Sequence, residues 1–275
     1  HCVTRRQRQM CIRDSDSSGR LAPYSEFAAA AAEMTPSSTP KLKKTSQFSI
    51  MGHSKPRHDI PSKVDGTAMF AMDVKRPGMV YAAVKRTPVA GGTLRRVDDN
   101  AARAMKGVID VVKVGPSSAA GLVGTYSAGD TIAVVADSYW TAEKALASLK
   151  LEWNTEGKER VSSESIFEQF DRDITAGVDR ANDVAMGDAT AAFDSAATVL
   201  TADYRVPYLA HTCMEPPNAT AEVFADRAEI WVGCQNPLGF RQHLAANLGL
   251  DVQQVTLHNY FMGGGFGRKS NADYA

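Results

Sequence analysis

A glycine-rich stretch near the C-terminal end most constrains what this chain can fold into. Residues 262–270 read MGGGFGRKS, with four glycines in five positions, and they follow an alternating run, 255–261, that predicts a strand ending in a loop. Because glycine has no Cβ atom, the loop can adopt positive φ and bring backbone N–H groups close to a ligand. Two basic residues and a hydroxyl follow. The composition predicts a loop that binds an anion, most often phosphate, and a tight turn between two strands is the alternative.

Two phosphate-binding motifs come close to matching this stretch. The dinucleotide motif G-x-G-x-x-G fits Gly263 and Gly265 but requires glycine where Arg268 stands. The P-loop motif G-x-x-x-x-G-K-[ST] fits Gly263, Lys269 and Ser270, and it too requires glycine at Arg268. A P-loop-like nucleotide-binding protein therefore stays open as an alternative.

Charge and cysteine content exclude several classes of function. The 275 residues hold 31 Lys plus Arg and 31 Asp plus Glu, so nothing favours nucleic acid or a membrane surface as partner. No apolar run approaches the roughly 18 residues that span a bilayer. The four cysteines are Cys2, Cys11, Cys213 and Cys234. They form no C-x-x-C pair and lack the spacing of a zinc or iron–sulfur site, and we expect no disulfide framework.

Both ends of the sequence look truncated. Residues 1–15 have no apolar period and resemble translated sequencing-adapter read-through, which indicates that they are not native to the protein. The sequence starts without methionine and stops shortly after the glycine loop. Any export signal is expected before the recorded start, which leaves localisation, periplasmic or cytoplasmic, open. Residues 16–49 hold an alanine-rich helix over 24–34 and a Pro/Ser/Thr linker over 35–40.

Alternating strands and helices predict an α/β unit over residues 50–155. Strands are expected at 78–85, 108–114, 131–136 and 151–153. Asp98 or Asp99 can cap a short helix ending at Gly107, and Ser138 a longer one whose inward residues are Tyr139, Ala142, Leu146 and Leu149.

A connection over 156–196, with one helix at 164–170, leads to a second domain over 197–275. Strands are expected there at 198–204, 218–224 and 228–232. Asn236 can cap the next helix with Pro237 at its first position and Gly249 at its end, and the expected inward residues are Leu238, Leu244, Ala245 and Leu248.

Polar residues mark two further segments of the second domain. His211, Cys213 and Glu215 could ligate a metal, but two following prolines predict a bend, in which Glu215 more readily accepts backbone N–H groups. Neither Cys213 nor Cys234 has a neighbouring base that would make it a nucleophile, and Cys234 is typical of a small buried residue at a strand end. Gln235 lies where a strand ends and a helix begins, the position at which α/β proteins present groups to a ligand.

Three segments, taken in order, carry a family resemblance: HTCMEP at 211–216, WVGCQNP at 231–237 and MGGGFGRK at 262–269. Together they resemble the molybdopterin-binding subunit of the xanthine dehydrogenase and aldehyde oxidase family, in particular the branch of the isoquinoline 1-oxidoreductase large (beta) subunit. Residues 56–74 resemble the opening of that family's α/β-hammerhead domain. The resemblance implies an α/β (α+β) fold, with the hammerhead domain over 50–155 and the truncated start of the molybdopterin-binding domain over 197–275.

The resemblance also implies roles for site residues. Gln235 would hydrogen-bond an oxo ligand of molybdenum, and Phe266 would lie at the substrate. No residue of the chain would ligate the metal directly, and the catalytic glutamate is expected beyond Ala275. Arg268 stands where many relatives have glycine, which favours the isoquinoline branch. The residues that would contact the cofactor are Gly264, Gly265, Phe266, Gly267 and Arg268.

The implied protein is a molybdenum hydroxylase that oxidises an N-heteroaromatic or aldehyde substrate with oxygen taken from water. Its cofactor would be molybdenum-molybdopterin in the cytosine dinucleotide form, and its [2Fe–2S] clusters would sit on a small iron–sulfur partner subunit. A non-catalytic binding module is a further alternative. We expect residues 1–275 alone to be inactive and to fold only in the first half, with a protected core at about 45–160.

Overall fold

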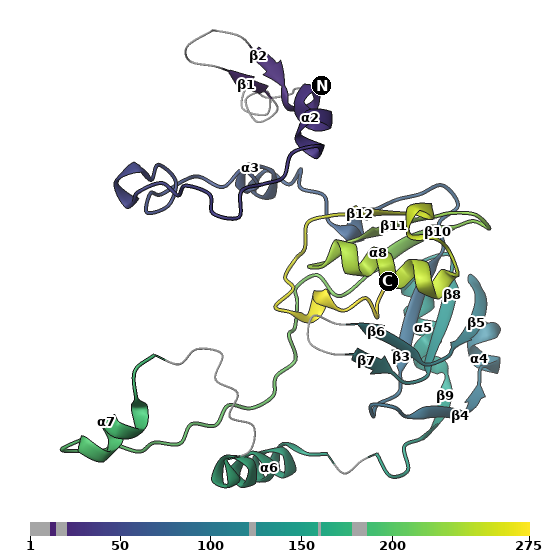
Figure 1. Cartoon of the computed structure of the whole chain (residues 1–275). Coiled ribbons are helices and arrows are strands. Elements are labelled where there is room, and N and C mark those ends of the chain that lie inside the picture. Colours follow the sequence, from purple (N-terminus) through teal and green to yellow (C-terminus); the bar gives the residue numbers. More distant parts are fainter. Residues whose placement is uncertain (1–11, 15–20, 121–124, 159–160, 178–185) are drawn as a thin grey trace. The chain divides into compact units, whose positions relative to one another are not determined.

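The computed structural model describes residues 12–14, 21–120, 125–158, 161–177 and 186–275 (Figure 1). Most of the segment interpreted as read-through thus lies outside the described residues. The chain divides at Ile60/Pro61 into two compact units. None of the described helices has the length and hydrophobicity needed to cross a bilayer.

The first unit contains a short antiparallel strand pair and helical turns. The helix expected over 24–34 is confirmed as a 3₁₀ turn that leads into an α-helix. The elements are β1 (Ile12–Asp14), β2 (Leu21–Pro23), η1 (Tyr24–Phe27), α2 (Ala28–Ala32), η2 (Thr45–Gln47) and the start of α3 (Ile60–Val64), which crosses the unit boundary.

The second unit begins with an α/β part built on small antiparallel sheets. Strand β8 lies between β3 and β5 in a three-stranded sheet, while β4 pairs with β9 and β6 with β7 (Figure 1). The strands expected at 108–114 and 131–136 are confirmed, and β4, β6 and β7 were not predicted. The elements are η3 (Ala71–Asp73), β3 (Tyr81–Arg86), β4 (Thr93–Asp98), α4 (Asn100–Arg103), β5 (Val108–Val114), β6 (Ser117–Ala120), β7 (Thr125–Ala128), β8 (Thr131–Ala136), α5 (Tyr139–Ser148) and β9 (Lys150–Asn154).

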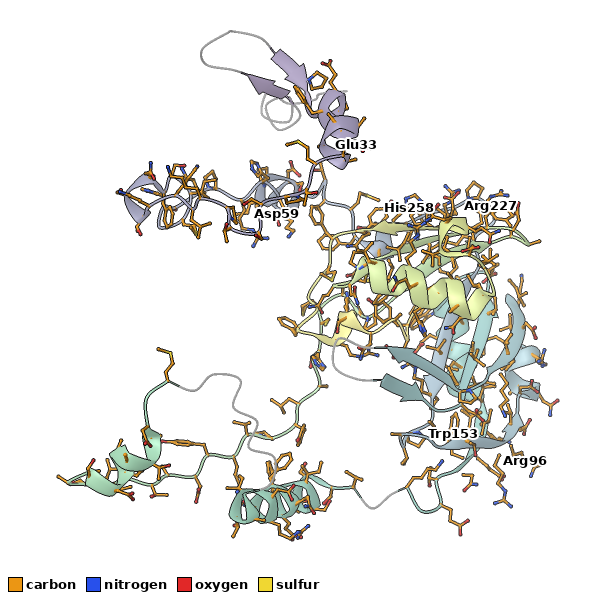
Figure 2. All side chains as sticks on the ribbon, in the orientation of Figure 1. Glu33, Asp59, Arg96, Trp153, Arg227 and His258 are labelled. Carbon is orange, nitrogen blue, oxygen red and sulfur yellow. The ribbon has the colours of Figure 1, made fainter. Side chains whose placement is uncertain are left out.

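Helix α5 covers this sheet and closes the first core. Ser138 accepts a hydrogen bond from the Thr141 N–H at 3.2 Å, so the predicted cap is confirmed. The expectation that Tyr139 faces inward is wrong. Tyr139 lies in the first turn of the helix, is exposed, and donates a hydrogen bond from its hydroxyl to Glu143. Trp153 of β9 (labelled in Figure 2) packs against the buried hydrophobic residues of this core. The helix contributes Ala142, Ala145 and Leu146 to the core, joined by Leu149 just after it.

The connection between the two parts contains α6 (Ser163–Ala176) and α7 (Ala189–Ser195). The helix expected over 164–170 is thus longer than predicted, and α7 was not predicted. The strand expected over 198–204 is wrong, because this apolar run has no neighbouring strand among the described residues and stays exposed. Tyr208 instead stacks on Phe167 of α6, with ring centroids 6.5 Å apart.

The C-terminal part is a three-stranded sheet with one helix packed on it (Figure 1). Strand β11 pairs antiparallel with β10 and parallel with β12, and α8 provides the crossover that a parallel pair requires. The elements are β10 (Ala219–Val223), β11 (Ala228–Val232), α8 (Pro237–Leu248), η4 (Val252–Gln254), β12 (Val255–Asn259) and η5 (Arg268–Ser270).

Both predicted ends of α8 are confirmed. Asn236 Oδ1 accepts from the Gly239 N–H at 3.1 Å, and Gly249 ends the helix with a φ of 67°. Leu244 and Ala245 are buried as expected, but Leu238 and Leu248 are exposed. The buried Phe240, one turn before Leu244, fills the interior that these two leucines were expected to fill.

Residues 70–76 pack against the C-terminal sheet, although they precede the first sheet in sequence. Phe70 forms a parallel bridge with Phe261, with ring centroids 6.2 Å apart. The Arg76 guanidinium lies 4.7 Å from the Trp231 ring centroid and pairs with Glu222 at 3.2 Å. Each part has its own buried core, so the structure differs from the expectation that only the first half folds.

We expect limited proteolysis of the 275-residue chain to cleave first within residues 197–211, which are exposed and lack helix or strand. The two fragments should stay associated in gel filtration, because residues 70–76 hold the C-terminal sheet, and should separate only in denaturant. Separate elution of the fragments in native buffer, or rapid digestion of 219–275, would contradict this arrangement.

Candidate functional site

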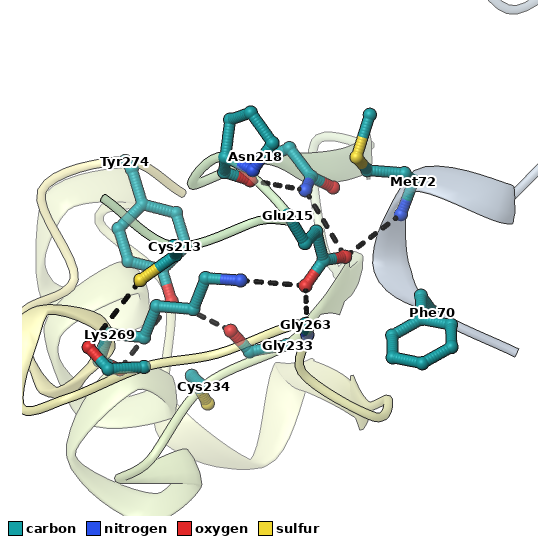
Figure 3. Close-up of polar contacts among 12 residues, drawn as sticks. Phe70, Met72, Cys213, Glu215, Asn218, Gly233, Cys234, Gly263, Lys269 and Tyr274 are labelled. Atoms are coloured by element: carbon teal, nitrogen blue, oxygen red, sulfur yellow. Dashed lines mark hydrogen bonds and ion pairs between the residues drawn. The ribbon is translucent and has the colours of Figure 1, made fainter. Parts of the chain in front are cut away.

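The structure brings together the three segments singled out in the sequence (Figure 3). The Glu215 N–H donates to the Gly263 carbonyl at 3.0 Å, which joins the first segment to the glycine loop. The Gln235 N–H donates to the Lys269 carbonyl at 2.9 Å, which joins the second segment to the end of the same loop. Residues up to 54 positions apart in sequence thus form one site.

A buried ion pair lies at the centre of this site. Glu215 Oε2 accepts from Lys269 Nζ at 2.6 Å, and the two side chains are only 6% and 1% exposed. The same carboxylate accepts from the Gly263 N–H at 2.9 Å and, at 3.4 Å, from the Met72 N–H (Figure 3). The predicted role of Glu215, accepting backbone N–H groups in a bend, is confirmed.

The surroundings of Glu215 hold it in the ionised form. Burial alone raises the pKa of its carboxyl, but the hydrogen bonds from Lys269 and Gly263 and the Lys269 charge outweigh burial and bring the pKa below its ordinary value.

The structure does not support a metal site at His211, Cys213 and Glu215. His211 is exposed. Within the described residues, no group of three or more His, Cys, Asp and Glu side chains could hold a metal ion.

The burial of Lys269 overturns the P-loop alternative. A P-loop lysine reaches bound phosphates at the start of a helix. Lys269 instead pairs with Glu215 in the interior, and the element that follows the loop is the short 3₁₀ turn Arg268–Ser270. Sequence reasoning missed this role because lysine is rarely buried.

The glycines of the loop are required by close approach as well as by backbone angles. A Cβ atom at Gly263 would lie 2.5 Å from Glu215 Cβ, and one at Gly265 would lie 2.7 Å from Gln235 Oε1. Gly264 and Gly267 have φ of 100° and 91°, values that side chains disfavour. The loop backbone therefore lies directly against Glu215 and Gln235.

Gln235 is oriented by the loop it faces. Its Oε1 accepts from the Gly267 N–H at 3.1 Å, which leaves Nε2 as a donor without an acceptor in the described part of the chain. Among the described residues, the N–H groups of Gly264, Gly265 and Phe266 likewise have no acceptor. A loop with several open N–H donors is typical of a site that binds an anionic group.

Phe266 presents an exposed aromatic ring beside these donors. The residue is 71% exposed, and its φ of 51° is unusual for a residue other than glycine. Such a conformation costs about 1–3 kcal/mol and is typical of functional sites. Cys213 lies nearby, with its Sγ 3.7 Å from the Gly265 carbonyl oxygen. An exposed ring can stack on a planar ligand.

Arg268, predicted to contact the cofactor, is engaged within the chain. Its guanidinium donates to both carboxylate oxygens of Asp273 at 2.8 Å. Arg86, the last residue of β3, donates to the same carboxylate. Sequence reasoning missed Asp273 and Arg86, since no local pattern relates two residues 187 positions apart.

Cys234 and Tyr274 belong to the interior behind the site. Cys234 is buried, as predicted, and burial raises the pKa of its thiol to about 11, which excludes a thiolate nucleophile at neutral pH. The Tyr274 hydroxyl donates to the Gly233 carbonyl at 2.9 Å (Figure 3). The Tyr274 ring packs edge-on against Phe240. Burial also raises the pKa of Tyr274.

Comparison with known proteins gives a match to one protein family and to several individual proteins. The family described as the molybdopterin cofactor-binding domain matches residues 171–275. Isoquinoline 1-oxidoreductase subunit beta of Brevundimonas diminuta is 32% identical over 237 residues, which cover 83% of this chain and 28% of that protein. The membrane-bound aldehyde dehydrogenase (pyrroloquinoline-quinone) of Gluconacetobacter polyoxogenes is 33% identical over 239 residues, covering 85% and 30%.

A solved structure shares the fold. Quinoline 2-oxidoreductase from Pseudomonas putida 86 matches with a TM-score of 0.56 at 22% identity, covering 79% of this chain and 31% of that one. The chain therefore spans less than a third of the length of each of these three proteins.

The buried ion pair makes a testable prediction. Glu215→Gln keeps the shape of the side chain but leaves the Lys269 charge buried without a counter-ion, which typically destabilises a protein by about 3–5 kcal/mol. Denaturant unfolding of the 275-residue chain measures this change. Glu222→Gln is the matched control, because its partner Arg76 and Glu222 itself are each more than 40% exposed and such pairs contribute about 1 kcal/mol or less. Equal effects of the two substitutions would contradict the central role of the buried pair.

Proposed function

Since this chain belongs to the molybdopterin-binding large subunits of the xanthine dehydrogenase and aldehyde oxidoreductase family, we propose that the protein it represents is a molybdenum hydroxylase. It would oxidise an N-heteroaromatic or aldehyde substrate and take the added oxygen from water. The observation that carries the proposal is the Gln235 amide, oriented by the Gly267 N–H beside a loop of open N–H donors.

The residues of the site fit a molybdopterin cofactor. Gln235 Nε2 and the N–H groups of residues 264–266 are donors suited to anionic oxygens, and the close approach of Gly265 to Gln235 places these donors side by side. We propose the cytosine dinucleotide form, which rests on the family resemblance. Arg268 would act through Asp273, because its guanidinium already binds that carboxylate.

The chain's own residues would bind and orient the reactants. The bound cofactor would supply the two-electron oxidation and the transfer of oxygen from water. Gln235 would donate a hydrogen bond toward it from a preorganised position, and the exposed Phe266 ring would hold a planar substrate. The two similar proteins are named as an isoquinoline oxidoreductase and an aldehyde dehydrogenase, and these names support the two substrate classes. A small iron–sulfur subunit would receive the electrons.

Metal analysis tests the proposal. We expect the full-length protein that contains this chain, purified from cells able to make the cofactor, to hold stoichiometric molybdenum and to reduce an electron acceptor when its iron–sulfur partner is present. Protein purified without molybdenum and without redox activity under these conditions would instead support a non-catalytic binding module.

Gln235→Ala should lower turnover of the full-length enzyme. Loss of one preorganised hydrogen bond at a reacting centre typically reduces the rate on the order of 10²-fold. Steady-state kinetics at equal molybdenum content measures the change. Gln242→Ala, at an exposed position of α8, is the matched control and should leave turnover unchanged. Normal turnover in Gln235→Ala would remove Gln235 from the site.

A further inference from the structure

Asp273 is a buried carboxylate held between two arginines from distant parts of the chain. Its side chain is only 1% exposed. Arg268 binds both of its oxygens at 2.8 Å in a fork geometry. Arg86 donates to one of the same oxygens and, from its other terminal nitrogen, to the backbone carbonyl of Asp273. One guanidinium of the first sheet thus holds both the side chain and the main chain of Asp273.

This contact fixes the segment that follows the glycine loop. Ala272 and Tyr274, on either side of Asp273, pack into the C-terminal core, while Asp273 reaches Arg86. Arg268 directly follows Gly267, whose N–H orients Gln235. A hydrogen-bonded path therefore runs from the end of β3 through Asp273 and Arg268 to the residues that face the ligand site.

We propose that Arg86 is a positioning residue for the cofactor loop, through which the first sheet holds the loop and Gln235 in their ligand-binding geometry. The proposal rests on the proposed function and adds a residue outside the three sequence segments that suggested it. Removing Arg86 leaves Asp273 paired with Arg268, so no buried charge is left without a partner. The substitution should therefore loosen the loop more than it destabilises the fold.

Lysine cannot replace Arg86 in this role. Arg86 makes two contacts in two directions from a planar group, whereas a lysine ammonium is a compact point charge on a flexible stem. Arg86→Lys keeps the charge, so it separates the geometric role from a purely electrostatic one. Arg96→Ala is the matched control, because Arg96 (Figure 2) is 74% exposed and lies 3.8 Å from Glu152.

The test uses the full-length holoenzyme. Wild type, Arg86→Ala, Arg86→Lys and Arg96→Ala are incubated below their unfolding temperatures, and the molybdenum retained by each protein is measured over time. Because residues in contact usually couple measurably, Arg86→Ala should lose molybdenum about twofold faster or more. Arg86→Lys should also lose it faster than wild type, and Arg96→Ala should match wild type. After partial reduction to Mo(V), the electron paramagnetic resonance spectrum of the molybdenum that remains should differ from wild type in both Arg86 variants.

A double-substitution cycle completes the test. In the Asp273→Asn background, Arg86→Ala should accelerate the loss by less than it does in wild type, because part of the Arg86 contact runs through the Asp273 carboxylate. Wild-type retention and spectrum in Arg86→Ala, or faster loss that only follows a lowered unfolding temperature with an unchanged spectrum, would overturn the positioning role and leave the proposed function intact. Wild-type enzyme that holds no molybdenum would instead refute the proposed function.

Discussion

The arrangement of the site depends on the buried ion pair between Glu215 and Lys269. Taking two charges out of water is unfavourable, and the pair is tolerated only because its geometry is close and further hydrogen bonds satisfy the carboxylate. An apolar pair could fill the same volume with equal or greater stability. A carboxylate, however, also accepts the Gly263 N–H. We infer that the charges set the register of the glycine loop against the 211–217 bend as well as filling space.

The position of the glycine loop follows from the parallel pairing of β11 and β12. Gln235 comes shortly after β11 and the loop shortly after β12, so the carboxyl ends of two parallel neighbours bring them to one edge. In α/β sheets, ligands bind at the carboxyl ends of the strands, where backbone N–H groups can donate to them. Helix α8 is required because a parallel pair cannot be closed by a hairpin.

Local signals were sufficient for much of the fold. The strands at 108–114 and 131–136, the Ser138 cap and the two ends of α8 all depend on neighbouring residues, and each was predicted. The expected strand at 198–204 failed because a strand requires a partner that its own sequence does not specify.

The candidate site was predictable only in part, and for a related reason. The order of three motifs indicated Gln235 and the glycine loop together, and the structure brings them into contact. Only the P-loop alternative gave Lys269 a role, that of binding phosphate. Its place in the interior could not be predicted locally, because it depends on Glu215, which lies 54 positions away. Arg86 carries no local signal at all, since its partner Asp273 lies 187 positions further along the chain.

That separation also bears on how the protein is made. A ribosome releases the chain from its N-terminal end, so all strands of the β3–β8–β5 sheet emerge well before Arg268 and Asp273. Contacts between residues so distant in sequence form late and slowly during folding, because a long loop must close first. The sheet that carries Arg86 can therefore fold before the glycine loop is synthesised. The loop segment that contains Asp273 then docks onto a sheet that is already folded.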